Sequence, residues 1–108
     1  MNNDRDFNEI VGDDLYSSGI RTGILIGLYG INKITFTELL VSTGLPKSSL
    51  YSHLKFLNEM KYVTVKTELT LRRPMTFIRI TETGKEKVRN YFVIIEKYRR
   101  NKETEPDR

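Results

Sequence analysis

The sequence predicts a single α+β domain in which helices surround a small sheet of two or three strands. Apolar side chains recur at helical spacing on both sides of Gly44, and residues 63–72 alternate with the period of a strand. The 108 residues of the chain are enough for one hydrophobic core and too few for two. We therefore expect one domain with short additional segments at its ends.

Residues 1–14 form an acidic N-terminal segment with five Asp and Glu and one Arg. Three apolar residues in this segment have the spacing of one or two turns of amphipathic helix: Phe7, Ile10 and Val11. A more strongly apolar helix should start after Ser17 or Ser18, because either hydroxyl can cap it, and should end near Gly30.

Glycine recurs every fourth residue in this helix, at Gly19, Gly23 and Gly27. Each glycine costs about 1 kcal/mol relative to alanine in a helix. Together they form a stripe almost free of side chains, which lets another helix approach closely. The stripe fits packing within the chain or contact between subunits, so Gly23 and Gly27 are candidates for a dimer interface.

Residues 35–38, Thr-Phe-Thr-Glu, have the spacing of a capping box, in which Thr35 and Glu38 satisfy backbone donors at a helix start. The helix that follows should cover Phe36–Thr43. Gly44 then ends it, because glycine adopts the left-handed conformation found after helices.

Pro46 opens the next helix, which we expect over about 46–60, because a missing N–H costs nothing in a first turn. Leu50, Leu54 and Leu57 share one face and should point into the core. The other faces are polar and basic, with Lys47, Ser48, Ser49, Tyr51, Ser52 and Lys55. Two helices joined by a short turn, the second polar outside, are typical of a helix-turn-helix that reads DNA.

Val63–Arg72 alternates without a break, which predicts a strand with one buried face. A basic turn, Arg72-Arg73-Pro74, leads into a returning strand over Met75–Ile80. This hairpin is a candidate wing. Its two guanidiniums suit phosphates or a narrow minor groove, although they would also serve as a solubilising turn.

A last helix should begin after Thr81 or Thr83 and continue to about Arg100. Its apolar residues cover more than the single stripe that one small domain can bury: Val88, Tyr91, Phe92, Val93, Ile94, Ile95 and Tyr98. We interpret 85–100 as a dimerisation helix with Tyr91, Phe92, Ile95 and Tyr98 at the interface. Residues 101–108 are expected to be a disordered tail.

Charge is distributed unevenly, because residues 15–100 hold 15 Lys and Arg and six Asp and Glu, a net charge of +9. A basic centre favours a polyanionic partner, with nucleic acid ahead of a membrane surface. No stretch is long and apolar enough to cross a membrane, and the start lacks the pattern of a secretory signal, so we expect a cytoplasmic protein. The chain has no cysteine.

Several features in a fixed order resemble the small winged helix-turn-helix regulators related to the MarR and ArsR families, closest to short archaeal-type members. They are Gly44-Leu45, Leu50, His53-Leu54, Leu57 and Tyr62-Val63, then Arg73-Pro74-Met75-Thr76 and Ile80-Thr81-Glu82-Thr83-Gly84. The resemblance covers roughly residues 20–92. It implies a winged helix-turn-helix over 15–84, a recognition helix in the major groove, a wing on the minor groove or backbone, and terminal helices that pair two subunits.

Two departures from the family pattern are visible. Lys61 stands where the family usually has glycine after the recognition helix, which predicts a turn that is slightly strained or differently shaped. The chain also lacks the Cys and His clusters of metal-sensing relatives. His53, its only histidine, is expected to contact phosphate or brace the wing, with simple packing as the alternative.

The sequence therefore predicts a non-enzymatic protein that binds double-stranded DNA as a dimeric, sequence-specific transcriptional regulator without a cofactor. The candidate DNA contacts are Thr35, Lys47, Ser48, Ser49, Tyr51, Ser52, His53, Lys55, Arg72 and Arg73. Two alternatives stay open: an architectural DNA-binding protein with little sequence preference, and a winged helix that binds other proteins. The operator, the regulated genes and any small-molecule effector are not indicated.

Overall fold

The computed structural model describes residues 3–16 and 18–104 and contains five helices and three strands in that part of the chain. In chain order they are α1 (Asn3–Gly12), α2 (Gly19–Ile31), β1 (Lys33–Thr35), α3 (Phe36–Thr43), α4 (Lys47–Glu59), β2 (Val63–Leu69), β3 (Pro74–Ile80) and α5 (Glu82–Thr104). The strands form one antiparallel sheet in the order β1-β3-β2. The predicted α+β winged helix-turn-helix is confirmed.

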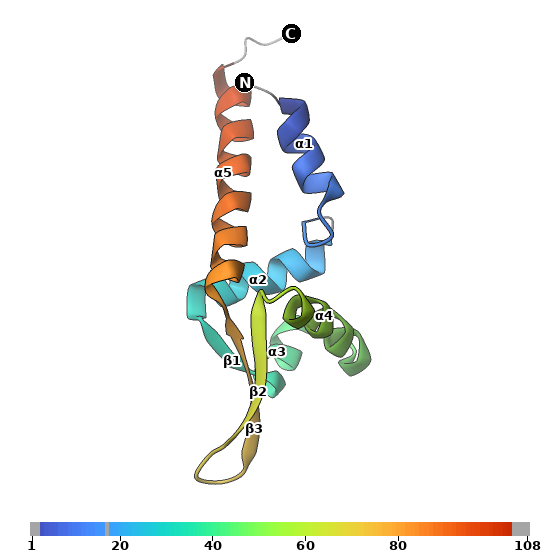
Figure 1. Cartoon of the computed structure of the whole chain (residues 1–108), viewed down its shortest axis with the longest axis vertical. Helices are drawn as coiled ribbons and strands as arrows, with labels where there is room; N and C mark the ends of the chain where they lie inside the picture. The colour runs from blue at the N-terminus through green and yellow to red at the C-terminus, as the bar shows by residue number, and fades with distance from the viewer. Residues whose placement is uncertain (1–2, 17, 105–108) are drawn as a thin grey trace.

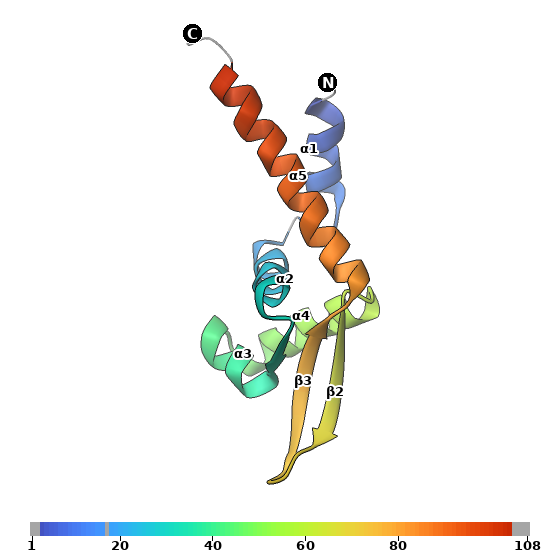
Figure 2. The same cartoon turned by 90° about the vertical axis from the view of Figure 1, so that its left-hand side faces the viewer.

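Helix α2 lies at the middle of an elongated molecule (Figures 1 and 2). On one side of it stand α1 and α5, and on the other lie α3, α4 and the sheet, with the β2–β3 hairpin projecting at the far end. The extents are 61 × 23 × 22 Å, and the radius of gyration is 16.6 Å. A compact chain of this length would have a radius of gyration of about 13 Å. The elements at the two ends of the molecule, α1 with α5 and the β2–β3 hairpin, therefore extend beyond the core.

The predicted helix ends agree with the structure. The Ser18 hydroxyl caps α2, while Ser17 lies outside the described residues. The Thr35 hydroxyl accepts a hydrogen bond from the Glu38 backbone, and the Glu38 carboxylate accepts one from the backbone N–H of Thr35, which completes the capping box of α3. Gly44 ends α3 with φ +66°.

Three leucines of α4 fix this helix in the core. Leu50 and Leu57 are fully buried and Leu54 nearly so, as their spacing predicts. They pack with Leu25 and Leu28 of α2 and with side chains of the sheet in one cluster. Because these three residues must point inward, the rotation of α4 about its own axis is determined.

The sheet differs from the prediction at both edges. Two or three strands were expected, and the third had no predicted position. It is β1, which pairs with β3 through Ile34 and Ile78. Strand β2 ends at Leu69 rather than at Arg72. The expected buried face is wrong for its outer part, because Leu69 and Leu71 are exposed to 84% and 107% where the hairpin outruns the core.

Hydrogen bonds tie the acidic N-terminal segment to α5. Helix α1 is longer than the one or two turns predicted, and Asp13, just after it, accepts a hydrogen bond from the Lys87 ammonium at 2.7 Å. Partial burial alone raises the pKa of Asp13, but the bonds from Lys87 and from the backbone of Leu15 outweigh it and hold that pKa below its usual value. The Tyr16 hydroxyl adds a bond to the Lys87 carbonyl at 2.7 Å.

Helix α5 starts after Thr81, whose hydroxyl accepts a hydrogen bond from the backbone N–H of Gly84 at 3.0 Å. Thr83, the alternative cap, lies inside the helix. A Cβ at Gly84 would overlap the carbonyl of Tyr62, so glycine is required there. The helix continues to Thr104, so 101–104 are helical rather than part of a disordered tail, and 105–108 lie outside the described residues.

The turn after α4 contains a strained residue, as the departure at Lys61 predicts. Lys61 has φ +64°, and its N–H bonds to the carbonyl of Asn58 at 3.0 Å. A side chain in this left-handed region costs about 1–2 kcal/mol, and glycine avoids that cost. Lys61 therefore holds a backbone conformation that glycine would adopt at lower cost.

We expect Lys61→Gly to raise the free energy of unfolding by about 0.5–1 kcal/mol, because the relief of strain exceeds the added entropy of the unfolded chain. Urea denaturation at fixed protein concentration measures this change. Gly44→Ala is the matched control, since its backbone has φ +66° and open space for a Cβ. It should lower stability by a similar amount. A Lys61→Gly variant no more stable than the parent protein would contradict the prediction.

Candidate nucleic-acid interface

The outer face of α4 carries most of the predicted DNA contacts. Burial of Leu50, Leu54 and Leu57 leaves Lys47, Ser48, Tyr51, Ser52 and Lys55 exposed. Ser49 and His53 are half-buried on the flanks of the helix. Short hydroxyl side chains near the start of α4 and a lysine at each end therefore form one polar surface, with a shape that a DNA groove can accept.

Tyr51 has a neighbour that the sequence analysis missed. Its ring stacks on that of Phe36 with 4.7 Å between centroids and 23° between planes, and 55% of Tyr51 remains exposed. Phe36 is the first residue of α3, so this pair joins the two helices of the helix-turn-helix at their outer surface. No local spacing links residues so far apart in the sequence, and only the fold brings them together.

Two of the predicted contacts, Thr35 and His53, are buried or partly buried. Thr35 is only 8% exposed, and its hydroxyl donates to the Glu38 carboxylate at 2.7 Å. The structure therefore places Thr35 inside the capping box and not on the outer face. His53 is half-buried, and its Nδ1 has no hydrogen-bond partner among the described residues, so no hydrogen bond from that atom braces the wing.

The tip of the hairpin is an ordered turn. The Thr70 hydroxyl donates to the carbonyl of Arg73 at 2.6 Å and accepts from the N–H groups of Arg72 and Arg73 at 3.4 and 3.3 Å. Both arginine side chains are exposed. The turn thus presents two guanidiniums at the end of a ribbon whose backbone conformation is already set.

Open clefts separate the hairpin from the helix-turn-helix. One, of about 300 Å³, lies between α4 and the sheet and is lined by Tyr51, Lys55 and Thr76 among others. A second, of about 270 Å³, lies between the first turn of α3 and the hairpin, where Thr37 and Arg73 line it. The recognition helix and the wing are therefore spaced apart, and the walls of the clefts are partly polar.

Some of the basic residues have carboxylate partners. On the sheet, Arg79 pairs with Glu68 at 2.5 Å, and the hydrogen bond from this arginine holds the pKa of the Glu68 carboxyl below its usual value. On α5 and near it, Lys87, Arg89, Arg99 and Arg100 likewise have carboxylate partners.

The cations of the candidate interface differ from these paired residues. Within residues 3–16 and 18–104, no carboxylate forms an ion pair with Lys47, Lys55, Arg72 or Arg73. All four lie on the side of α2 opposite α1 and α5 (Figure 1). Their charge is therefore available to a polyanion on one side of the molecule.

The predicted dimer contacts fall on two separate surfaces. On α5, Phe92, Val93 and Ile95 are exposed to 46%, 54% and 43%, while Ile94 between them is buried. Tyr91 is half-buried against the ring of Tyr16, with 5.3 Å between centroids. Tyr98 is also half-buried. Over residues 91–95, α5 is therefore apolar on nearly all sides.

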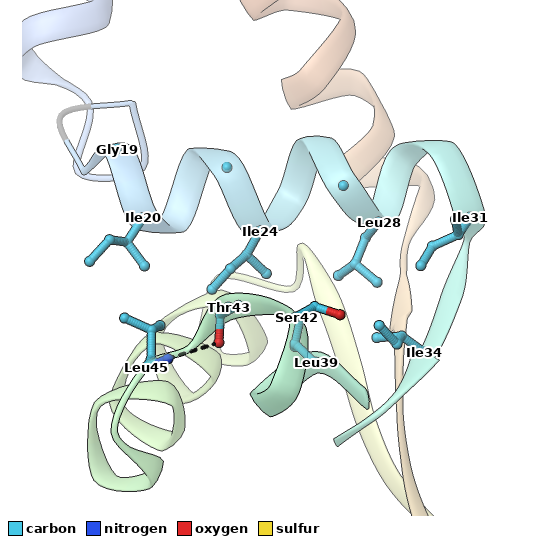
Figure 3. A pocket seen from close by; sticks show the side chains of 12 residues that line it. Gly19, Ile20, Ile24, Leu28, Ile31, Ile34, Leu39, Ser42, Thr43 and Leu45 are labelled. Carbon is cyan, nitrogen blue, oxygen red and sulfur yellow. Dashed lines mark hydrogen bonds between the residues drawn. The ribbon is translucent and has the colours of Figure 1, made fainter. Parts of the chain in front are cut away.

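Gly23 and Gly27 line a different feature, a groove of about 410 Å³ on α2 (Figure 3). Its walls come from α2, β1, α3 and the turn after α3, with Ile24 and Leu45 facing each other across it. No atom of the described chain lies within 4 Å of a Cβ built on either glycine. Packing within the chain, one of the two interpretations of the glycine stripe, is not found among the described residues.

The described residues also limit other functions. None of the described helices is both long and apolar enough to span a membrane. Within the same part of the chain, no group of three or more His, Cys, Asp or Glu is arranged to hold a metal ion.

This fold and this surface define a DNA-binding winged helix. Residues 20–98, which make up most of the chain, match the family model described as "Winged helix DNA-binding domain". The protein therefore belongs to the winged helix DNA-binding domain family. The predicted winged-helix family is confirmed.

Known relatives agree with this assignment. An uncharacterised protein of Methanocaldococcus jannaschii is 34% identical over 71% of this chain and 84% of its own length. The structure of a transcriptional regulator homologue from Pyrococcus horikoshii superposes with a TM-score of 0.82 at 23% identity, covering 90% of this chain and 96% of that one. The haem sensor PefR from Streptococcus agalactiae gives a TM-score of 0.73 at 17% identity, covering 97% and 71%. The two structural likenesses show the fold.

Proposed function

We propose that this protein is a homodimeric transcriptional regulator that binds particular sequences of double-stranded DNA. In this proposal α4 enters the major groove, and the β2–β3 hairpin contacts the minor groove or the adjacent backbone. In this proposal the protein acts in the cytoplasm. No cofactor or effector is part of the proposal.

The observation that carries the proposal is that the basic residues of α4 and of the hairpin tip have no carboxylate partner. Arg79 on the sheet and several cations on α5 are paired with carboxylates, while Lys47, Lys55, Arg72 and Arg73 have none among the described residues. Unpaired cations on one side of a protein supply the contacts to phosphate that dominate affinity for DNA. The side chains of α4 between the lysines are short or aromatic, as contacts to base edges require.

The exposed apolar residues in the middle of α5 support a dimer. A helix that is apolar on all sides is normally buried, yet Phe92, Val93 and Ile95 have large exposed fractions. Val11 in α1 is also 57% exposed. Two-fold pairing through such a self-complementary patch would bury it and place two recognition helices on one DNA duplex. Gly23 and Gly27 remain candidates for a second contact.

The first test separates base recognition from phosphate binding along α4. A preferred site is selected from random duplexes, and each variant is then titrated against that site and against random DNA. Ser49→Ala or Tyr51→Ala should cost about 1–3 kcal/mol at the preferred site and little on random DNA, because only base contacts are lost. Lys55→Ala should weaken both. Equal losses for Ser49→Ala and Tyr51→Ala on both duplexes would favour an architectural protein.

The second test concerns the wing. Replacing Arg72 and Arg73 by Ala should weaken binding about equally on all sequences, because phosphate contacts carry little base information. The slope of log K against log salt should fall by roughly 1 per lost phosphate contact. Arg99→Ala with Arg100→Ala removes the same charge at the far end of α5 and should change the slope less. A protein that binds no DNA even at low salt would point to a protein-binding winged helix.

The third test concerns the dimer. Ile95→Asp places a charge in the proposed interface and should convert a dimer to a monomer at micromolar concentration, as measured by analytical ultracentrifugation. Val41→Asp is the matched control, because Val41 is 78% exposed on α3, far from the patch. A parent protein that sediments as a monomer, with no change on Ile95→Asp, would refute the proposed interface.

A further inference from the structure

The β2–β3 hairpin has an apolar face that continues beyond the core. Across the hairpin, Val63 pairs with Ile80 and Val65 with Ile78, and these four residues contact or join the core. On the same face follow Thr67 and Thr76, whose hydroxyls are 3.0 Å apart, and then Leu69 opposite Pro74. This face borders the clefts toward α3 and α4, because Val65, Pro74 and Thr76 line them.

The end of this face is exposed to an unusual degree. Leu69 is 84% and Leu71 107% exposed, and Pro74 beside them is exposed as well. Single exposed leucines are common on protein surfaces. Here two leucines and a proline occupy one turn at the extremity of the molecule, where the hairpin projects away from the helices (Figure 2).

Their surroundings identify the partner. Arg72 and Arg73 directly follow Leu71, have no carboxylate partner among the described residues, and so attract the tip to a polyanion. Thr70 holds the turn by three hydrogen bonds, so little conformational entropy is lost when the tip inserts. An apolar end flanked by guanidiniums matches the minor groove of DNA, in which phosphates border walls of deoxyribose C–H groups.

We infer that Leu71, supported by Leu69, is an apolar wedge that enters the minor groove while Arg72 and Arg73 bind the flanking phosphates. The inference rests on the proposed function and deepens it. Apolar side chains inserted in this groove partly unstack a base step, and the cost is lowest at flexible pyrimidine–purine steps. The wing therefore selects deformable DNA at positions that α4 does not reach, without a hydrogen bond to any base.

The test uses the full-length protein and labelled duplexes that share the preferred site of α4 but differ beneath the wing, with either a TA step or a stiff A-tract. The parent protein should bind the TA duplex more tightly. Leu71→Ser should lose roughly tenfold in affinity on the TA duplex, as expected for the exposure of one leucine, and most of the preference with it. The salt slope should stay unchanged, because no phosphate contact is removed.

Controls separate the wedge from other effects. Leu71→Met keeps an apolar side chain and should retain the preference, whereas Val41→Ser removes an exposed apolar residue elsewhere and should have no effect. If Leu71→Ser and Leu69→Ser bind like the parent while the arginine variants weaken, the wedge is refuted and the proposed function stands. A change of oligomeric state in Leu71→Ser with unchanged DNA affinity would equally refute it. If the parent binds no DNA, the proposed function fails first.

Discussion

The burial of Leu50, Leu54 and Leu57 is the constraint on which the rest of the structure depends. These leucines anchor α4 between α2 and the sheet, and a helix anchored along one face has no freedom to rotate. The side chains on the opposite face, from Lys47 to Lys55, are therefore exposed by geometry rather than by their own preference. Stability and recognition thus use the two faces of one helix. Any rotation of α4 would move both faces together.

Charge is organised around the same division. Carboxylates on α5, on β2 and after α1 neutralise the cations that hold these elements together, as in the pair of Asp13 and Lys87. The half-buried position of this pair makes it a structural tie between the N-terminal segment and α5. Lys47 and Lys55 on α4 and Arg72 and Arg73 at the hairpin tip have no carboxylate partner among the described residues. A modest formal charge of +4 for the whole chain therefore coexists with a strongly basic working surface.

Features set by neighbours in the sequence could be predicted well. The capping box of Thr35 and Glu38, the stop at Gly44 and the strain at Lys61 depend on a few adjacent residues, whose backbone geometry is local. Features set by distant neighbours could not. Strand β1 has three residues, too few to show a period, and exists because β3 pairs with it. Thr35 has the polarity of a surface contact, yet this pairing buries it.

The sequence by itself determined the order of the helices and of the hairpin strands, the inward face of α4 and the basic character of the centre, because spacing and charge are properties of the chain. Only the tertiary structure decided where the core ends along the hairpin, since alternation continues unchanged from Val63 to Leu71 while burial stops after the first residues. It also decided that Tyr51 meets Phe36 and that Gly23 opens on a groove. Such contacts depend on the distance between elements in space, which no local pattern encodes.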